Sequence, residues 1–232
     1  MTGRRLANPF RGALGAALAA ALLSIPPLMI WADKPLALYM KAQQDEGFRA
    51  FFDVVTLLGE SQYSLVPAGV LGLVLWAVIK FGNLDELKRA TCLKVAQAAG
   101  FVFACVALGG IATNIVKALV GRARPKLLFR EETYGFDPLI LDASWHSFPS
   151  GHTNSAIAAA LALAMLFPKV RWPLLMLGGL IAFSRVAVTA HYMADIVGGT
   201  VLAVLTCWFV GKYFAHKNWL FTESPAGLTV RP

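Results

Sequence analysis

The sequence predicts an all-α integral membrane protein: a six-transmembrane-helix bundle with an interfacial outer helix between the first two spans. Three observations favour this fold. Apolar residues make up 57% of the 232 residues, and charged residues only 15%, where soluble chains have about 25%. The apolar residues also gather into runs long enough to cross a hydrocarbon layer of ~30 Å as helices.

Six apolar runs lie at 12–31, 62–79, 97–116, 151–168, 172–190 and 196–211. Only the fifth contains a charged residue, Arg185. Each run is expected to be helical, because lipid cannot satisfy the polar groups of an open backbone. We therefore treat 1–232 as a single membrane domain.

The first run follows Arg4, Arg5 and Arg11, an arrangement that resembles a signal peptide. It is longer than a typical signal-peptide core, and no small-x-small cleavage site follows it. We therefore expect a retained first helix, bent near Pro26-Pro27.

The interfacial outer helix is predicted between the first two spans. Phe48, Phe51, Phe52 and Val55 recur at helical spacing there, with charged residues on the other faces. This pattern is typical of a helix lying in the membrane interface, or of a cap packed over the bundle.

A formal net charge of +8 would suggest nucleic-acid binding in a soluble protein. Here the basic residues lie mostly between apolar runs, where they orient a membrane protein, and no nucleic-acid partner is expected. With the N-terminus inside, 12 of the 21 lysines and arginines fall on the inner side. They are Arg4, Arg5, Arg11, Lys80, Lys88, Arg89, Lys94, Lys169, Arg171, Lys212, Lys217 and Arg231. Cytoplasmic termini are therefore predicted.

The three cysteines, Cys92, Cys105 and Cys207, form no CxxC pair. The latter two fall within apolar runs and are expected to be small core side chains rather than ligands or disulfide partners.

Three polar segments stand out because they interrupt or end apolar runs. They are 117–125 after the third run, 149–152 before the fourth, and 184–195 between the fifth and sixth. With six spans and inside termini, all three segments reach the same outer face.

The cations Lys117, Arg124 and Arg185 need an anionic partner in this setting. A bound phosphate would serve, gripped by the arginine forks. Lys117 and Arg124 are seven residues apart and share a face if the helix continues. Four nearby acids offer partial neutralisation: Glu131, Glu132, Asp137 and Asp142.

Ser150 and Gly151 stand at a helix start. Backbone N–H groups there, with the positive end of the helix dipole, form an anion cradle that glycine lets a ligand approach closely. Ser150 is also expected to be the N-cap.

His191 and Asp195 are four residues apart and share a face on a helix. The carboxylate would fix the tautomer of the imidazole and leave its other nitrogen free to attack phosphorus. His152, which lacks such a partner, is better suited to protonate a leaving oxygen. His146 and His216 are interpreted as structural.

The motifs K-x6-R-P (Lys117 to Pro125), P-S-G-H (Pro149 to His152) and S-R-x5-H-x3-D (Ser184 to Asp195) occur intact and in order. The chain thereby resembles the type 2 phosphatidic acid phosphatase superfamily. The resemblance implies a metal-independent membrane phosphatase, without a cofactor, that works through a phosphohistidine. By residue match, His191 is the nucleophile, Asp195 its orienting partner and His152 the general acid. The matched phosphate-binding residues are Lys117, Arg124, Ser150, Gly151 and Arg185.

The implied partner is a lipid phosphate in the membrane. Candidate substrates are phosphatidic acid, phosphatidylglycerol phosphate, undecaprenyl pyrophosphate and lipid A 1-phosphate. A multi-pass protein of the cell inner membrane is expected, with its active site at the periplasmic face. A lipid-to-lipid phosphotransferase stays open as an alternative. An anion transporter is less favoured, because the charges lie at span ends. The oligomeric state is left open.

Overall fold

The structure, a computed structural model, describes residues 12–224 and 227–230. Its helices are α1 (Ala13–Pro27), α2 (Asp33–Ala42), α3 (Glu46–Leu57), α4 (Gln62–Phe81), α5 (Glu86–Val120), α6 (Pro125–Glu131), α7 (Gly151–Leu166), α8 (Arg171–Ala187) and α9 (Met193–His216). Short helical segments lie at Leu28–Ala32, Ala143–Trp145 and Pro168–Val170, and strands β1 (Phe221–Ser224) and β2 (Gly227–Val230) form a hairpin. The basic residues Arg4, Arg5, Arg11 and Arg231 lie outside the described residues.

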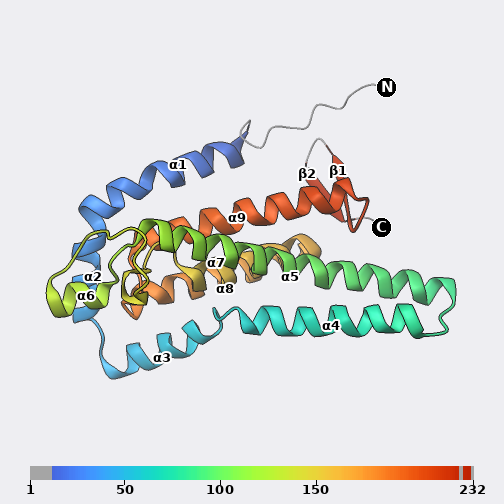
Figure 1. Cartoon of the computed structure of the whole chain (residues 1–232), viewed down its shortest axis with the longest axis horizontal. Helices are drawn as coiled ribbons and strands as arrows, with labels where there is room; N and C mark the ends of the chain where they lie inside the picture. The colour runs from blue at the N-terminus through green and yellow to red at the C-terminus, as the bar shows by residue number, and fades with distance from the viewer. Residues whose placement is uncertain (1–11, 225–226, 231–232) are drawn as a thin grey trace.

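The long helices α1, α4, α5, α7, α8 and α9 run along the long axis of the molecule (Figure 1). Helices α2 and α6 lie at one end, and the α4–α5 turn and the hairpin lie at the other (Figure 1). Within the described residues, five helical stretches are long and apolar enough to cross a membrane, and the 16-residue α7 is a shorter apolar helix. Large apolar side chains on α4, such as Leu73 and Trp76, are exposed. The chain is thus a mostly helical, multi-pass membrane protein.

Each predicted apolar run falls on one of these helices, but the ends differ. The clearest difference is α5, which extends from Glu86 to Val120 although the predicted run covers only 97–116. Asp85 caps its first turn by accepting a hydrogen bond from Lys88 N at 2.8 Å. A capped helix can begin before the apolar run that crosses the membrane. The apolar run alone therefore placed the N-terminal end of α5 too late in the sequence.

The expected bend in the first helix follows Pro26 and Pro27 directly. Residues Leu28–Ala32 form a π-helical segment, after which α2 turns across the end of the bundle (Figure 1). Proline lacks the N–H that an α-helix needs, which accounts for the irregularity at this point. The helix expected around Phe48 to Val55 is α3; it packs on α8 through Phe52 and Phe183, whose ring centroids are 5.9 Å apart.

Helices α5, α7 and α9 form the main core. Cys105 and Cys207 are buried in it as free thiols, as predicted. Small residues let the helices approach closely: a Cβ on Gly199 would lie 2.6 Å from the carbonyl oxygen of Ser150. This contact holds the start of α7 against the first turns of α9.

Candidate active site

The segment that follows α5 turns sharply rather than continuing as a helix. Gly121 ends α5 in the left-handed conformation, with φ of 57°, and a Cβ there would lie 1.7 Å from Asp137 O. Lys117 and Arg124 were expected to share a face only if the helix continued, and this condition is not met, since Arg124 is the N-cap of α6. The two side chains still meet, because Lys117 Nζ and Arg124 Nη2 both donate to the backbone oxygen of His146, at 2.6 and 3.3 Å.

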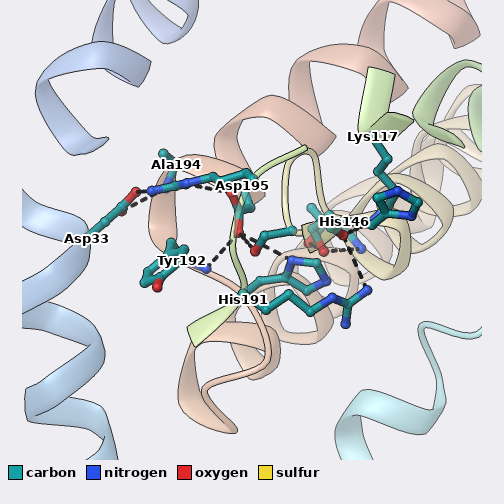
Figure 2. A network of polar contacts seen from close by, with 12 residues as sticks. Asp33, Lys117, His146, His191, Tyr192, Ala194 and Asp195 are labelled. Atoms are coloured by element: carbon teal, nitrogen blue, oxygen red, sulfur yellow. Dashed lines mark hydrogen bonds and ion pairs between the residues drawn. The ribbon is translucent and has the colours of Figure 1, made fainter. Parts of the chain in front are cut away.

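His191 and Asp195 are in contact, as their spacing predicted. His191 lies in the loop before α9 rather than on the helix, and Asp195 lies in the first turn of α9. The imidazole Nδ1 is 3.3 Å from Asp195 Oδ2 (Figure 2). Asp195 Oδ2 also accepts from Ser147 Oγ at 2.6 Å and from Tyr192 N at 2.9 Å. This arrangement directs Nδ1 toward the carboxylate, and Nε2 has no hydrogen bond to another described residue.

The His191 ring is buried, with 3% of the residue exposed. Burial lowers its pKa to about 3, and the hydrogen bond and charge of Asp195 offset this only in part. The positive charges of Lys117 and Arg124 also lower the pKa. His191 is consequently a neutral imidazole at physiological pH, the form that a nucleophile requires.

Asp195 has a further partner that the sequence did not indicate, Arg122. Arg122 Nη1 donates to Asp195 Oδ1 at 2.6 Å, and Nη2 donates to Asp33 Oδ2 at 2.8 Å. Asp33 Oδ1 accepts from Ala194 N at 3.0 Å (Figure 2). All three charged side chains are almost fully buried. Although burial opposes it, the charges of Asp195 and Asp33 raise the pKa of the Arg122 guanidinium. Asp33, at the start of α2, is thus connected through Arg122 to Asp195, the partner of His191.

No local sequence signal distinguished the role of Arg122 from that of Arg124. Arg122 and Arg124 are separated by one residue, and side chains at this spacing lie on the same face of a regular extended strand. Here Arg122 forms an isolated β-bridge with Phe136, while Arg124 starts α6. The arginines therefore serve different partners, and the matching carboxylate, Asp33, directly follows the first apolar run.

The start of α7 has the predicted N-cap. Ser150 Oγ accepts from Thr153 N at 3.4 Å, and Ser150 N donates to the backbone oxygen of Asp195 at 3.0 Å. A Cβ on Gly151 would lie 3.8 Å from Lys117 Cε, so the lysine passes close to the first turn of α7. The N–H groups of this turn and the lysine together favour an anion.

Arg124 and Arg185 each have an unsatisfied buried donor. Within the described residues, neither Nε has a hydrogen-bond partner. Arg185 is held from one side by Thr56, whose Oγ1 accepts from Nη1 at 2.5 Å. A buried guanidinium N–H without a partner is costly, so both arginines are prepared to bind an anion.

The predicted neutralisation of these cations by loop acids is wrong for Asp142, which instead accepts hydrogen bonds from Ser144 N and Oγ. In the part of the chain that the structure describes, no carboxylate forms an ion pair with Lys117, Arg124 or Arg185. The region therefore keeps an excess of positive charge.

The two histidines border the same group of cations. The charges of Lys117 and Arg124 act on His191 as well as on His152, and Arg185 also acts on His152. All eight residues singled out from the sequence thus gather at one end of the bundle. Over residues 12–224 and 227–230, no group of three or more His, Cys, Asp or Glu residues is placed to hold a metal ion.

A pocket of about 610 Å³ opens beside His152. It is lined by the α3–α4 turn and α4 (Gly59, Glu60, Ser61, Gln62, Leu65), α5 (Val106, Ala107, Gly110, Ile111, Thr113, Asn114) and α7 (Gly151, His152, Ser155). His191 and the three cations are not among its lining residues. The pocket therefore reaches the site from the His152 side.

Residues 98–219, just over half of the chain, match the PAP2 superfamily, and the chain belongs to this family. It is similar to Lipid A 1-phosphatase of Rhizobium etli, with 30% identity over 139 residues that cover 60% of each chain. It is also similar to Undecaprenyl-diphosphatase BcrC of Bacillus subtilis, with 29% identity over 145 residues that cover 62% of this chain and 66% of the relative. The matched segment thus spans roughly 60% of the length of these curated relatives.

Two solved structures have the same fold. One is the PAP2 type phosphatidylglycerolphosphate phosphatase of Bacillus subtilis, with a TM-score of 0.58 and 20% identity, over 86% of this chain and 96% of that one. The other is LpxE of Aquifex aeolicus, with a TM-score of 0.54 and 19% identity, over 78% of this chain and 95% of that one.

Proposed function

We propose that this chain is a membrane phosphatase that removes a phosphate group from a lipid through a phosphohistidine on His191. One observation supports this most directly: a neutral imidazole held by a carboxylate lies beside cations that have unsatisfied buried donors. The family to which the chain belongs and the phosphatase activities named for its relatives agree with this chemistry.

In the first step, Nε2 of His191 forms a bond to phosphorus while the bond from phosphorus to the lipid oxygen breaks. His152 gives its proton to that oxygen, and Asp195 stabilises the positive charge that develops on the His191 ring. In the second step, His152 takes a proton from water, the water oxygen bonds to phosphorus, and the bond to His191 breaks. Inorganic phosphate and free His191 result.

Charge on the three equatorial oxygens of the phosphoryl group needs preorganised donors. Lys117, Arg124 and Arg185 supply positive charge. The first N–H groups of α7, at Ser150 and Gly151, are assigned the remaining contacts. No metal and no cofactor take part in this scheme.

We further propose six spans, formed by α1, α4, α5, α7, α8 and α9, in one domain over 1–232. The termini are assigned to the cytoplasm and the site to the periplasmic face of the inner membrane, because the inner connections are basic. Helix α3 would then lie in the outer interface, where its exposed Phe51 and Val54 meet lipid.

The substrate is a lipid whose phosphate reaches this face, with phosphatidic acid, phosphatidylglycerol phosphate, undecaprenyl pyrophosphate and lipid A 1-phosphate as candidates. Its leaving group would occupy the pocket between α4, α5 and α7, because His152, the proposed proton donor, lines that pocket.

The test uses the purified full-length chain, supplied with each of these lipids in mixed micelles containing EDTA. We expect release of inorganic phosphate by the unaltered chain and none by His191→Ala. His216→Ala, at the opposite end of the bundle, is the matched control and should retain full turnover. Unchanged hydrolysis by His191→Ala would reject the proposed nucleophile.

The same assay separates hydrolysis from phosphotransfer. With a ³²P-labelled lipid donor and an unlabelled acceptor lipid, a phosphatase releases the label as inorganic phosphate. Label that appears on the acceptor would instead favour the phosphotransferase alternative.

A further inference from the structure

Two residues that line the pocket beside His152, Glu60 and Gln62, contain hydrogen-bond acceptors. Gln62 Nε2 donates to Glu60 Oε2 at 2.7 Å, in a solvent-exposed hydrogen bond. The second carboxylate oxygen of Glu60 and the amide oxygen of Gln62 are left to accept hydrogen bonds from a ligand. Glu60 is the only carboxylate among the residues that line the pocket.

Another residue that lines this pocket, Thr113 on α5, has a buried hydroxyl without a hydrogen-bond partner in the described part of the chain. Thr113 is 1% exposed, and within the described residues its Oγ1 makes no hydrogen bond. Thr113 and Glu60 both line the same pocket, one on α5 and the other on the α3–α4 turn. A buried hydroxyl without a partner indicates that the pocket receives a polar group rather than only an acyl chain.

The position of Glu60 relative to the chemistry follows from His152. The turn that contains Glu60 packs directly on this histidine, since a Cβ on Gly59 would lie 3.4 Å from His152 Cβ. Under the proposed function, His152 protonates the leaving oxygen. Glu60 therefore lies on the His152 side of the site, and its negative charge also acts on Arg185.

Charge then distinguishes two kinds of leaving group. Hydrolysis of a lipid diphosphate would place a second, anionic phosphate beside Glu60. Hydrolysis of a monophosphate ester would place a neutral alcohol there. Two negative charges at close range in a partly buried setting repel each other, whereas hydroxyl or amide N–H groups would satisfy the acceptors.

We propose that Glu60 and Gln62 select a monophosphate ester whose leaving group carries hydrogen-bond donors, such as a sugar or glycerol headgroup, and disfavour a lipid diphosphate. This inference rests on the proposed function and names the substrate class of that same site.

The experiment compares kcat/KM for four substrates of the purified full-length chain: a lipid-linked sugar 1-phosphate, phosphatidylglycerol phosphate, a prenyl monophosphate and the prenyl diphosphate of the same chain length. The two prenyl substrates differ only in the second phosphate. The sugar and glycerol substrates distinguish the two sources of hydroxyl donors.

We expect the unaltered chain to prefer the prenyl monophosphate over the diphosphate, and to prefer at least one hydroxyl-bearing substrate over both. Glu60→Gln keeps the shape and removes the charge. It should raise relative activity on the diphosphate about tenfold, since a unit charge is removed from a partly buried contact. Glu86→Gln, at the far end of α5, is the charge-matched control and should leave the substrate ratios unchanged.

The outcomes separate this inference from the proposed function. Phosphate release from all four substrates with a preference for the diphosphate, or Glu60→Gln ratios equal to those of the unaltered chain, would overturn the selection by Glu60 alone. No phosphate release from any of them would overturn the proposed function, and the inference with it.

Discussion

Arg122 and Asp33 form an ion pair at 2.8 Å in which both side chains are almost fully buried, although 89 positions separate them. The same guanidinium bonds Asp195 at 2.6 Å and lies 4.4 Å from the ring centroid of Tyr192. The carboxylate that holds His191 is thus itself held by an arginine from a different segment.

Replacing Arg122 with glutamine should therefore destabilise the protein strongly. It leaves two buried carboxylates without their cation, and breaking a buried pair in this way costs about 3–5 kcal/mol in the free energy of unfolding. Thermal unfolding in detergent micelles measures the loss. Arg49→Gln is the control, because Arg49 and Asp53 form an exposed pair that should contribute less than about 1 kcal/mol. Equal stability of the two variants would contradict the assigned role of Arg122.

The buried His191 ring should make stability depend on pH. Its folded pKa of about 3 is below the ordinary value of about 6.5 in the unfolded chain. The contribution of the neutral His191 ring to the free energy of unfolding is therefore complete above about pH 6.5 and is lost as the pH falls toward 3. At pH 5 the loss should be about 2 kcal/mol relative to pH 7.5.

Unfolding curves at these two pH values test this effect, with His191→Gln for comparison. The variant has no imidazole to protonate, yet its amide can still donate to Asp195. Its stability should fall less between pH 7.5 and pH 5 than that of the unaltered chain. The same fall in both proteins would show that His191 does not titrate as described.

Gly199→Ala tests the contact between α7 and α9. The new methyl group would meet the Ser150 carbonyl oxygen at 2.6 Å, and this backbone atom is fixed by the N-cap. Overpacking of this kind costs about 1–3 kcal/mol, and it should also lower kcat by displacing the first turn of α7. Gly179→Ala on α8 meets no atom within 4 Å and should be tolerated. Matching losses in the two variants would count against a specific contact.

Thr56→Val should weaken substrate binding by releasing Arg185. The hydroxyl accepts from Arg185 Nη1, and a hydrogen bond to a charged group contributes about 1.5–3 kcal/mol. We expect kcat/KM to fall about tenfold or more, with a larger effect on KM than on kcat. Thr91→Val removes an exposed hydroxyl that bonds only within α5 and serves as control. A normal KM in Thr56→Val would mean that other contacts hold Arg185.

The sequence predicted where the helices lie and selected residues that the structure brings together, because apolar runs and short polar motifs are local signals. Lys117, Ser150 and His191 were found in this way. Their detailed contacts were harder to predict, since Gly121 interrupts the helix that was expected to align Lys117 with Arg124. The oxygen that joins these two side chains belongs to the backbone of His146, and side-chain patterns contain no information about it.

Asp33, Arg122 and Thr56 were missed for a different reason. Each is an ordinary polar residue in its own segment, and its significance depends on a partner from a distant part of the chain. Only the packing of α2, α3 and α8 around the site reveals these pairs. A search for charged residues that border apolar runs would have selected Asp33, but not its partner.

The Asp33–Arg122 ion pair also limits which part of the chain can form the complete site. The family match covers residues 98–219, yet one counterion of Arg122, Asp33, and the acceptor for Arg185, Thr56, come from the preceding 97 residues. A shortened protein that starts at the family boundary would leave both arginines without these bonds. Completion of the site therefore depends on the docking of the N-terminal helices against the segment that matches the family.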